Sequence, residues 1–374
     1  MLRTATNTTD NGVAAMHGKP RNLSPAADAE STMSSFPPAQ PGAPPSFYAA
    51  RRLFPGAERH IYMDTAARGL IASPTRAAVD RFLDERMHGE ADKDGMFRTV
   101  ERARELFARL VGASPDEVAL VKNVSEGLNA VATALPWRAG DNLVMCPEVE
   151  HPNAVYVALN LRRRIGIEVR AVPARNGAVP AEELGAAVDG RTRLVLVSAV
   201  SLAPGRRVDL EPLAAACRRH DALLLVDGAQ SVGVLHTDVA AQGIDALSVS
   251  TQKGLLGFYG MGFLYCRREW AERLSPVYLA RFGVDLGAAH EAAFGGGEFR
   301  LQPGARRFDV GNYNYVGATA AEAALDLLLS YGTRRIESYV RGLAEELARG
   351  AQAAGLTLSG GEPGPDLGSI VCLG

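Results

Sequence analysis

The stretch "LLLVDGAQSVG", residues 223–233, decides the class of fold. Large apolar residues follow one another without a polar residue between them, and the run ends at Asp227. A strand that is apolar on both faces is covered on both sides, which is typical of parallel strands in a sheet flanked by helices. Burying the Asp227 carboxylate without a cation is costly. We therefore expect a cationic partner for it, either in a structural salt bridge or as the protonated nitrogen of a heterocyclic ligand.

Similar apolar runs recur along the chain and alternate with segments of helical periodicity. Helical patterns cover residues 151–166 and 209–220, which lie between such runs, and most of the chain after residue 305. This alternation predicts an α/β fold. The other strands are predicted at "VALVK" (118–122), "NLVMC" (142–146), "RLVLVSAV" (193–200), "ALSVS" (246–250) and "GFLYC" (262–266).

Composition narrows the classes of partner. The chain has 374 residues, of which 47% are hydrophobic and 22% charged, so it can bury a large core. Its formal net charge of -2, with acids and bases interleaved, argues against a nucleic-acid partner. No apolar run reaches the ~18 residues that a membrane span needs. The scattered cysteines show no C-x-x-C spacing, which indicates neither a zinc site nor a disulfide framework and favours a cytoplasmic location.

The N-terminal region differs from the rest of the chain. Residues 1–46 are rich in Ser, Thr, Ala and Pro and lack a periodic apolar face, which predicts a disordered leader. An organelle transit peptide is the alternative for this basic, hydroxyl-bearing start.

Polar residues follow the predicted strands, at the sheet edge where α/β proteins bind their ligands. Lys253 follows an apolar run, where lost solvation lowers the pKa of its amine and makes the nucleophilic form accessible. Ser125 lies at a predicted helix start that suits a phosphate, although a plain N-cap is the alternative. His151 is either an interior histidine or a flat ring for an aromatic cofactor. Glu150 also lies at a strand end.

These residues in this order describe a pyridoxal phosphate site. The carboxylate of Asp227 suits a protonated ring nitrogen, and the amine of Lys253 suits a Schiff base with an aldehyde. From "IYMDTAARGL" (61–70) to its C-terminus, the chain resembles the class V, fold type I pyridoxal phosphate enzymes. That group contains aminotransferases, cysteine desulfurases and the isopenicillin N epimerase-like branch, to which "VSLAPGRRVDL" and "KGLLGFYGMGFLY" are most similar.

The resemblance implies a mostly parallel, seven-stranded sheet flanked by helices. It implies that residues 47–70 contribute to a small domain and to the mouth of the active site. Residues 71–300 would form the large, cofactor-binding domain, and residues 301–374 a smaller C-terminal α/β domain that is truncated.

The resemblance also implies a role for each residue of the site. The aldehyde would be held by Lys253, and the phosphate by Val124 and Ser125, with a hydrogen bond from Gln252. In family dimers, the stretch "RRFDVGNYN" (306–314) reaches the partner's phosphate, so a homodimer with shared sites is implied. The remaining roles are His151 stacked on the pyridine ring, Asp227 on its nitrogen, Gln230 near its phenolic oxygen, and Gly311 and Asn312 at the partner's site.

Three departures from the family pattern bear on the reaction. Gln252 stands where many relatives have a histidine, and Leu202 where desulfurases usually have an asparagine. The sequence ends at Gly374, before the segment in which relatives carry the arginine that binds the substrate carboxylate and, in desulfurases, the reactive cysteine. Arg68 is the candidate that replaces this arginine.

The expected substrate is a small molecule with an amino group. The expected activity is that of an aminotransferase or an epimerase-like enzyme. One alternative is a C–S lyase of the cysteine desulfurase or selenocysteine lyase type. Another is a catalytically defective homologue that serves as a binding or dimerisation partner. A dinucleotide-binding module fits less well, because no G-x-G-x-x-G follows the first strand.

Overall fold

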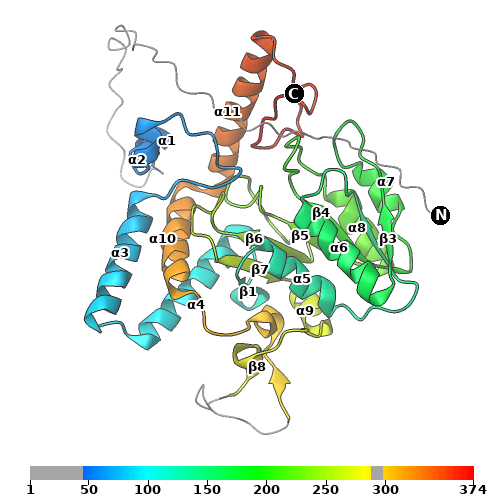
Figure 1. The fold of residues 1–374 in the computed structure, drawn as a ribbon, viewed down its shortest axis with the longest axis horizontal. Helices are drawn as coiled ribbons and strands as arrows, with labels where there is room; N and C mark the ends of the chain where they lie inside the picture. The colour runs from blue at the N-terminus through cyan, green and yellow to red at the C-terminus, as the bar shows by residue number, and fades with distance from the viewer. Residues whose placement is uncertain (1–44, 288–297) are drawn as a thin grey trace, which may run out of the picture. The chain divides into compact units, whose positions relative to one another are not determined.

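The computed structural model describes residues 45–287 and 298–374. Its centre is a seven-stranded sheet with the strand order β1-β7-β6-β5-β4-β2-β3, shown in Figure 1. Strand β7 is antiparallel to both of its neighbours, and the other pairs are parallel. The predicted mostly parallel, seven-stranded sheet is therefore confirmed. The strands are β1 (Val118–Val121), β2 (Asn142–Met145), β3 (Glu168–Ala171), β4 (Thr192–Ser198), β5 (Leu223–Asp227), β6 (Ala246–Ser250) and β7 (Gly262–Cys266).

Helices connect the successive strands from β1 to β5, as the alternating sequence pattern predicts, whereas β5, β6 and β7 follow one another without a helix between them. A small hairpin of β8 (Val284–Asp285) and β9 (Arg300–Leu301) lies outside the central sheet. The α-helices are α1 (Phe47–Arg51), α2 (Pro55–Arg59), α3 (Ser73–His88), α4 (Lys93–Val111), α5 (Val124–Ala134), α6 (Pro152–Ile165), α7 (Ala181–Ala186), α8 (Glu211–His220), α9 (Arg268–Arg273), α10 (Tyr315–Tyr331) and α11 (Thr333–Ala353). The 3-10 turns are η1 (Pro115–Glu117), η2 (Arg281–Gly283) and η3 (Gly304–Phe308).

Each central strand packs against helices on both faces. In β5, Leu224 and Val226 join the core that includes residues of α4, α8 and α10. Leu223 and Leu225 point to the opposite face and join the core that includes residues of α5, α6 and α9. Successive side chains of a strand alternate between faces. This two-sided burial explains why the run 223–226 is continuously apolar.

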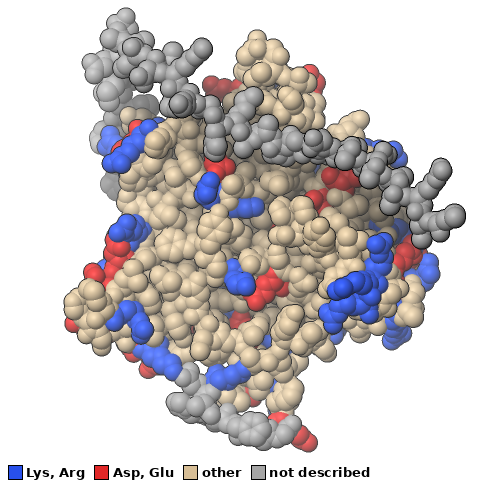
Figure 2. All heavy atoms as spheres, viewed as in Figure 1, with Lys and Arg blue, Asp and Glu red and all other residues tan. Residues whose placement is uncertain are grey.

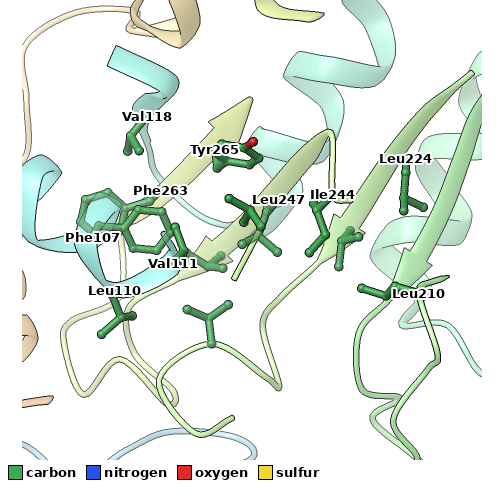
Figure 3. Packing of buried hydrophobic residues seen from close by; sticks show 14 of the residues in the cluster. Phe107, Leu110, Val111, Val118, Leu210, Leu224, Ile244, Leu247, Phe263 and Tyr265 are labelled. Carbon is green, nitrogen blue, oxygen red and sulfur yellow. The ribbon is translucent and has the colours of Figure 1, made fainter. Parts of the chain in front are cut away.

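Figure 3 shows the first of these two cores from close by. Phe107 of α4 stacks on Phe263 of β7, with ring centroids 4.4 Å apart and an angle of 8° between the rings. Leu247 of β6 and Leu224 of β5 continue the same layer across the sheet. Because aromatic and branched side chains interlock here, α4 is fixed against the antiparallel strand β7.

Strand β3 was not found from the sequence. Its residues, "EVRA", are partly or fully exposed and two of them are charged. It forms the edge of the sheet, pairing with β2 alone. Charged side chains protect an edge strand from pairing with other chains, and they also remove the apolar signal on which strand prediction depends.

The C-terminal region departs from the expected α/β character. Among the described residues after Leu301, the named elements are all helical, and residues 354–374 pair through the single bridges Arg206–Leu367 and Leu358–Leu373. A salt bridge of 2.6 Å between Arg206 and Asp366 holds this segment to the loop after β4. The domain boundaries expected near residues 47, 71 and 301 stay predictions. The predicted leader, 1–46, lies outside the described residues except for its last two positions.

Basic and acidic side chains are intermixed over the face of the molecule that Figure 2 shows. In the part of the chain that the structure describes, we find no helix with both the length and the apolar character of a membrane span.

Candidate active site

The polar candidates meet at the carboxyl ends of the central strands. Asp227 is the last residue of β5 and stands in register between Ser198 of β4 and Ser248 of β6. Lys253 lies in the turn that follows β6, and His151 begins α6 after β2. The strand order therefore gathers residues that are far apart in the sequence, because neighbouring parallel strands end at the same edge.

Asp227 is a buried carboxylate with one free oxygen. Asp227 is only 6% exposed, and its Oδ1 accepts a hydrogen bond of 2.9 Å from the backbone N–H of Ala229. Burial raises the pKa of Asp227, while the Ala229 N–H and the nearby Lys253 and His151 oppose that rise. Within residues 45–287 and 298–374, no basic side chain forms a salt bridge with this carboxylate. The structural salt bridge considered from the sequence is therefore not found.

Lys253 presents a partly buried amine to this carboxylate. Burial lowers the pKa of Lys253 below its ordinary value, and the nearby Asp227 raises it in part. The expected lowering of this pKa is confirmed. In the described part of the chain, the amine has no hydrogen-bond partner, so it is available to a ligand.

The N-terminal segment 62–70 runs directly beside Lys253. The N–H of Gly69 donates a hydrogen bond of 2.7 Å to the carbonyl of Gln252. A Cβ at position 69 would lie 2.5 Å from the Lys253 carbonyl oxygen, closer than any real side chain approaches. Gln230 Nε2 donates to the carbonyl of Ala66 over 3.0 Å, which fixes the same segment from the β5 side. The role of this segment as the mouth of the site stays a prediction.

Arg68 lies on this segment but points to a carboxylate of its own chain. Its guanidinium forms a salt bridge of 3.2 Å with Asp64, and its side chain is 63% exposed. The Tyr62 hydroxyl donates a hydrogen bond of 2.7 Å to the Arg68 carbonyl. The backbone of Arg68 is thus held near Gln252 and Lys253 through Gly69, while its side chain is mobile enough to leave an exposed ion pair at little cost.

Helix α5 begins with Asn123, and not Ser125, as its N-cap residue. Asn123 is the N-cap, and its Oδ1 accepts the N–H of Glu126 at 2.9 Å. The plain Ser125 cap considered from the sequence is therefore wrong. Among the described residues, neither Val124 nor Ser125 has an acceptor for its backbone N–H. These donors lie at the positive end of the helix, where they favour an anion.

Helix α5 packs so closely on β6 that position 127 has no room for a side chain. A Cβ at Gly127 would lie 2.2 Å from Ser248 Oγ. The Ser248 hydroxyl donates a hydrogen bond of 3.0 Å to the Val124 carbonyl. Because Ser248 also pairs in register with Asp227, the anion-binding helix start and the buried carboxylate share one support.

His151 caps α6 and lies close to Asp227. Its Nδ1 accepts the N–H of Asn153 at 3.2 Å, so in the neutral ring Nε2 carries the proton. The His151 ring is close enough to Asp227 to lower the pKa of that carboxyl slightly. The cap fixes the plane of the imidazole, which a stacking role requires.

Gly311 and Asn312 lie between η3 and α10, and Asn312 is exposed. The neighbouring Asn314 Nδ2 donates a hydrogen bond of 3.0 Å to the Gly260 carbonyl. The start of this segment is anchored by the Asp309 carboxylate. It accepts a hydrogen bond of 2.8 Å from the Leu120 N–H and another of 2.8 Å from the guanidinium of Arg104, which is fully buried.

Sequence reasoning gave Glu150 no role, yet it is a fully engaged, buried carboxyl of the site. It is 8% exposed and accepts the N–H of Ser198 at 2.7 Å and the Ser198 hydroxyl at 2.6 Å. Burial, with the nearby Asp227, raises the pKa of Glu150 to about 7. The signal available in the sequence was an acid directly before His151 at a strand end.

Comparison with known proteins identifies the family. The model of the family described as aminotransferase class-V matches residues 61–373. The chain belongs to the class-V aminotransferase family. Like the other members of this class-V family, it is a pyridoxal phosphate-dependent enzyme.

Three similar class-V proteins illustrate the range of this family. An uncharacterized aminotransferase of Bacillus subtilis is 31% identical, with 86% of this chain and 83% of the relative covered. The apo cysteine desulfurase of Thermococcus onnurineus matches with a TM-score of 0.77 and 25% identity over 87% of this chain and 82% of that one. A C-DES variant with glycine covalently linked to its pyridoxal phosphate matches with a TM-score of 0.73 and 25% identity over 81% and 80% of the two chains.

The described residues fit the class-V cofactor. Within the described residues, Asp227 forms no salt bridge and accepts a hydrogen bond only at Oδ1, while the amine of Lys253 has no hydrogen-bond partner. The backbone N–H groups at the start of α5 are donors suited to a phosphate. The carboxylate and the amine attract each other, and each keeps hydrogen-bonding capacity for a ligand.

Proposed function

We propose that this chain acts on the Cα of an amino acid as an aminotransferase or epimerase-like enzyme, with Lys253 as the covalent attachment point of the cofactor. The observation that carries this proposal is the buried pair of Lys253 and Asp227. Burial keeps the pKa of the amine low, and the carboxylate lacks a salt bridge within the described part of the chain. Such opposed shifts in one site are typical of catalytic groups.

Each residue at the strand ends has a part in holding the cofactor. We infer that the Asp227 carboxylate pairs with the ring nitrogen and that the His151 ring covers one face. The N–H groups of Val124 and Ser125 hold the phosphate at the start of α5. The remaining amides act at the edge of the ring, Gln230 near the phenolic oxygen and Gln252 near the phosphate.

Lys253 moves the proton on which every reaction at Cα depends. When bound, pyridoxal phosphate supplies an electron sink for the electron pair left at Cα. The neutral amine of Lys253 accepts the Cα proton, and the ammonium form returns it. Burial lowers the pKa of Lys253 and so makes the neutral amine more accessible than in a solvated lysine, while the Asp227 charge nearby stabilises the ammonium form.

Cleavage of a C–S bond is the second candidate, because the similar Thermococcus structure is a cysteine desulfurase. Sulfur transfer to the protein needs a reactive thiolate. Cys146, Cys217 and Cys266 are buried, and burial raises the pKa of each thiol. Burial also raises the pKa of the partly exposed Cys372, whose Sγ lies 3.8 Å from the Leu202 carbonyl. These raised values favour proton transfer at Cα over sulfur transfer to a described cysteine.

We infer that the working form is a homodimer in which Gly311 and Asn312 complete the partner's phosphate site. Asn312 is exposed on a segment anchored at Asp309, whose carboxylate accepts the Leu120 N–H. Light scattering should give about twice the chain mass of 39.6 kDa. Asn312→Ala should weaken cofactor binding by about tenfold, the loss of one good hydrogen bond to a charged group. A monomer that binds the cofactor fully would contradict this inference.

The reaction class is tested with the holoenzyme and a panel of amino acids. We expect keto-acid release or exchange of the Cα proton with D2O, measured by NMR, without sulfide from cysteine. Arg68→Ala should raise KM for the substrate by about tenfold, because a carboxylate partner is lost. Arg76→Ala is the matched control, since Arg76 forms a similar exposed ion pair with Asp80. Sulfide as the main product would instead assign the chain to C–S cleavage.

A further inference from the structure

Glu150 links three elements of the site through one buried carboxyl. It precedes His151 in the chain, and its carboxyl accepts hydrogen bonds from both the N–H and the hydroxyl of Ser198, the last residue of β4. Ser198 in turn pairs in register with Asp227. The loop that carries the His151 ring is therefore tied to the strand beside the Asp227 carboxylate.

A structural tie alone would not require a charge. A glutamine could accept the Ser198 N–H and donate to its hydroxyl without the cost of burying a second carboxylate beside Asp227. The ionisable groups around Glu150 do not offset that charge directly. They are Asp227, the Cys146 thiol and the exposed Glu148, with His151 next in the chain and Lys253 facing Asp227. Near neutral pH the Glu150 carboxyl is therefore present in both forms.

We propose that Glu150 is a positioning residue whose buried charge strengthens the hold of Asp227 on a protonated ring nitrogen, and that its proton passes to solvent when the cofactor binds. This inference rests on the proposed pairing of Asp227 with the cofactor. A cation beside Asp227 offsets the charge that opposes ionisation of Glu150. By linkage, ionised Glu150 must then favour binding of that cation to the same extent.

The test compares wild type with Glu150→Gln, which keeps both bonds to Ser198 and removes the charge. Pyridoxal phosphate is titrated into the apo proteins at pH 7 by calorimetry, in buffers of different ionisation enthalpy. Wild type should release about half a proton more than the variant, because the Glu150 pKa of about 7 leaves the free carboxyl half protonated. Cofactor affinity of the variant should be within about twofold of wild type at pH 6 and about tenfold weaker at pH 8, the effect of lowering the Glu150 pKa by about one unit on binding.

Glu148→Gln is the matched control. Glu148 is exposed and accepts the Ala174 N–H at 3.0 Å, so the variant removes a nearby carboxylate that is not beside Asp227. It should behave as wild type. Equal proton release and equal pH dependence in wild type and Glu150→Gln would overturn the inference and leave Glu150 as a structural tie.

Two further results separate the possible failures. If wild type shows no visible cofactor band, the proposed function itself fails. If Glu150→Gln does not fold, difference infrared spectroscopy of wild type decides. Loss of a protonated-carboxyl band on cofactor binding at pH 6.5 supports the inference, and an unchanged band overturns it.

Discussion

Lys253→Ala should lose the covalent link to pyridoxal phosphate and about 10⁴-fold in kcat, the range expected when a positioned acid–base group is removed. In the proposed function, the amine of Lys253 both attaches the aldehyde and moves the Cα proton. Substrate binding depends on other residues, so KM should change much less than kcat. In the wild-type protein, borohydride should fix the cofactor on the peptide that contains Lys253, detected by mass spectrometry.

Lys122→Ala is the matched control for this prediction. Lys122 also follows a strand, β1, and precedes α5, but its side chain is exposed. The control should retain the visible band and the activity. Added methylamine should restore part of the activity of Lys253→Ala by acting as the missing base. Borohydride labelling of Lys122, or full activity of Lys253→Ala, would contradict the assignment.

The reliable predictions from sequence are those that depend on local pattern. The runs at 223–227, 246–250 and 262–266 became β5, β6 and β7, because both faces of a central strand are buried and the signal is continuous. Asp227 and Lys253 could be selected because a charged residue after such a run is unusual. The exposed edge strand β3 carries no such signal.

The relations between distant residues could not be predicted in the same way. The pairing of Ser198 with Asp227 depends on β4 lying beside β5, and the bond from Ser198 to Glu150 depends on β2 lying on the other side of β4. The choice of Asn123 rather than Ser125 as the cap of α5 is a difference of two positions between residues that both favour N-caps. The role of Glu150 therefore required the strand order, whereas the role of Asp227 did not.

Asp227→Asn should reduce kcat by about 10³-fold, because the amide keeps the bond to the Ala229 N–H but cannot hold a proton on the ring nitrogen. The apo protein should respond in the opposite direction. Burial raises the pKa of Asp227 above its unfolded value, so at pH 7 its ionised form destabilises the fold. The asparagine variant should therefore raise the apo Tm by a few degrees, measured by calorimetry. Stability and activity would then change in opposite senses at one residue.

Asp245 provides the contrast that makes this result specific to the active site. It is also buried, but its carboxylate accepts the Leu224 N–H at 2.9 Å and forms a salt bridge of 2.9 Å with Arg267. Burial also raises the pKa of Asp245, so Asp245→Asn should raise the apo Tm as well, but with little effect on kcat. If Asp227→Asn lowered the Tm, Asp227 would be a structural acid. A raised Tm together with a large loss of kcat, found at Asp227 and not at Asp245, would mean that the Asp227 carboxylate is maintained at a cost to the apo fold for the cation that it binds.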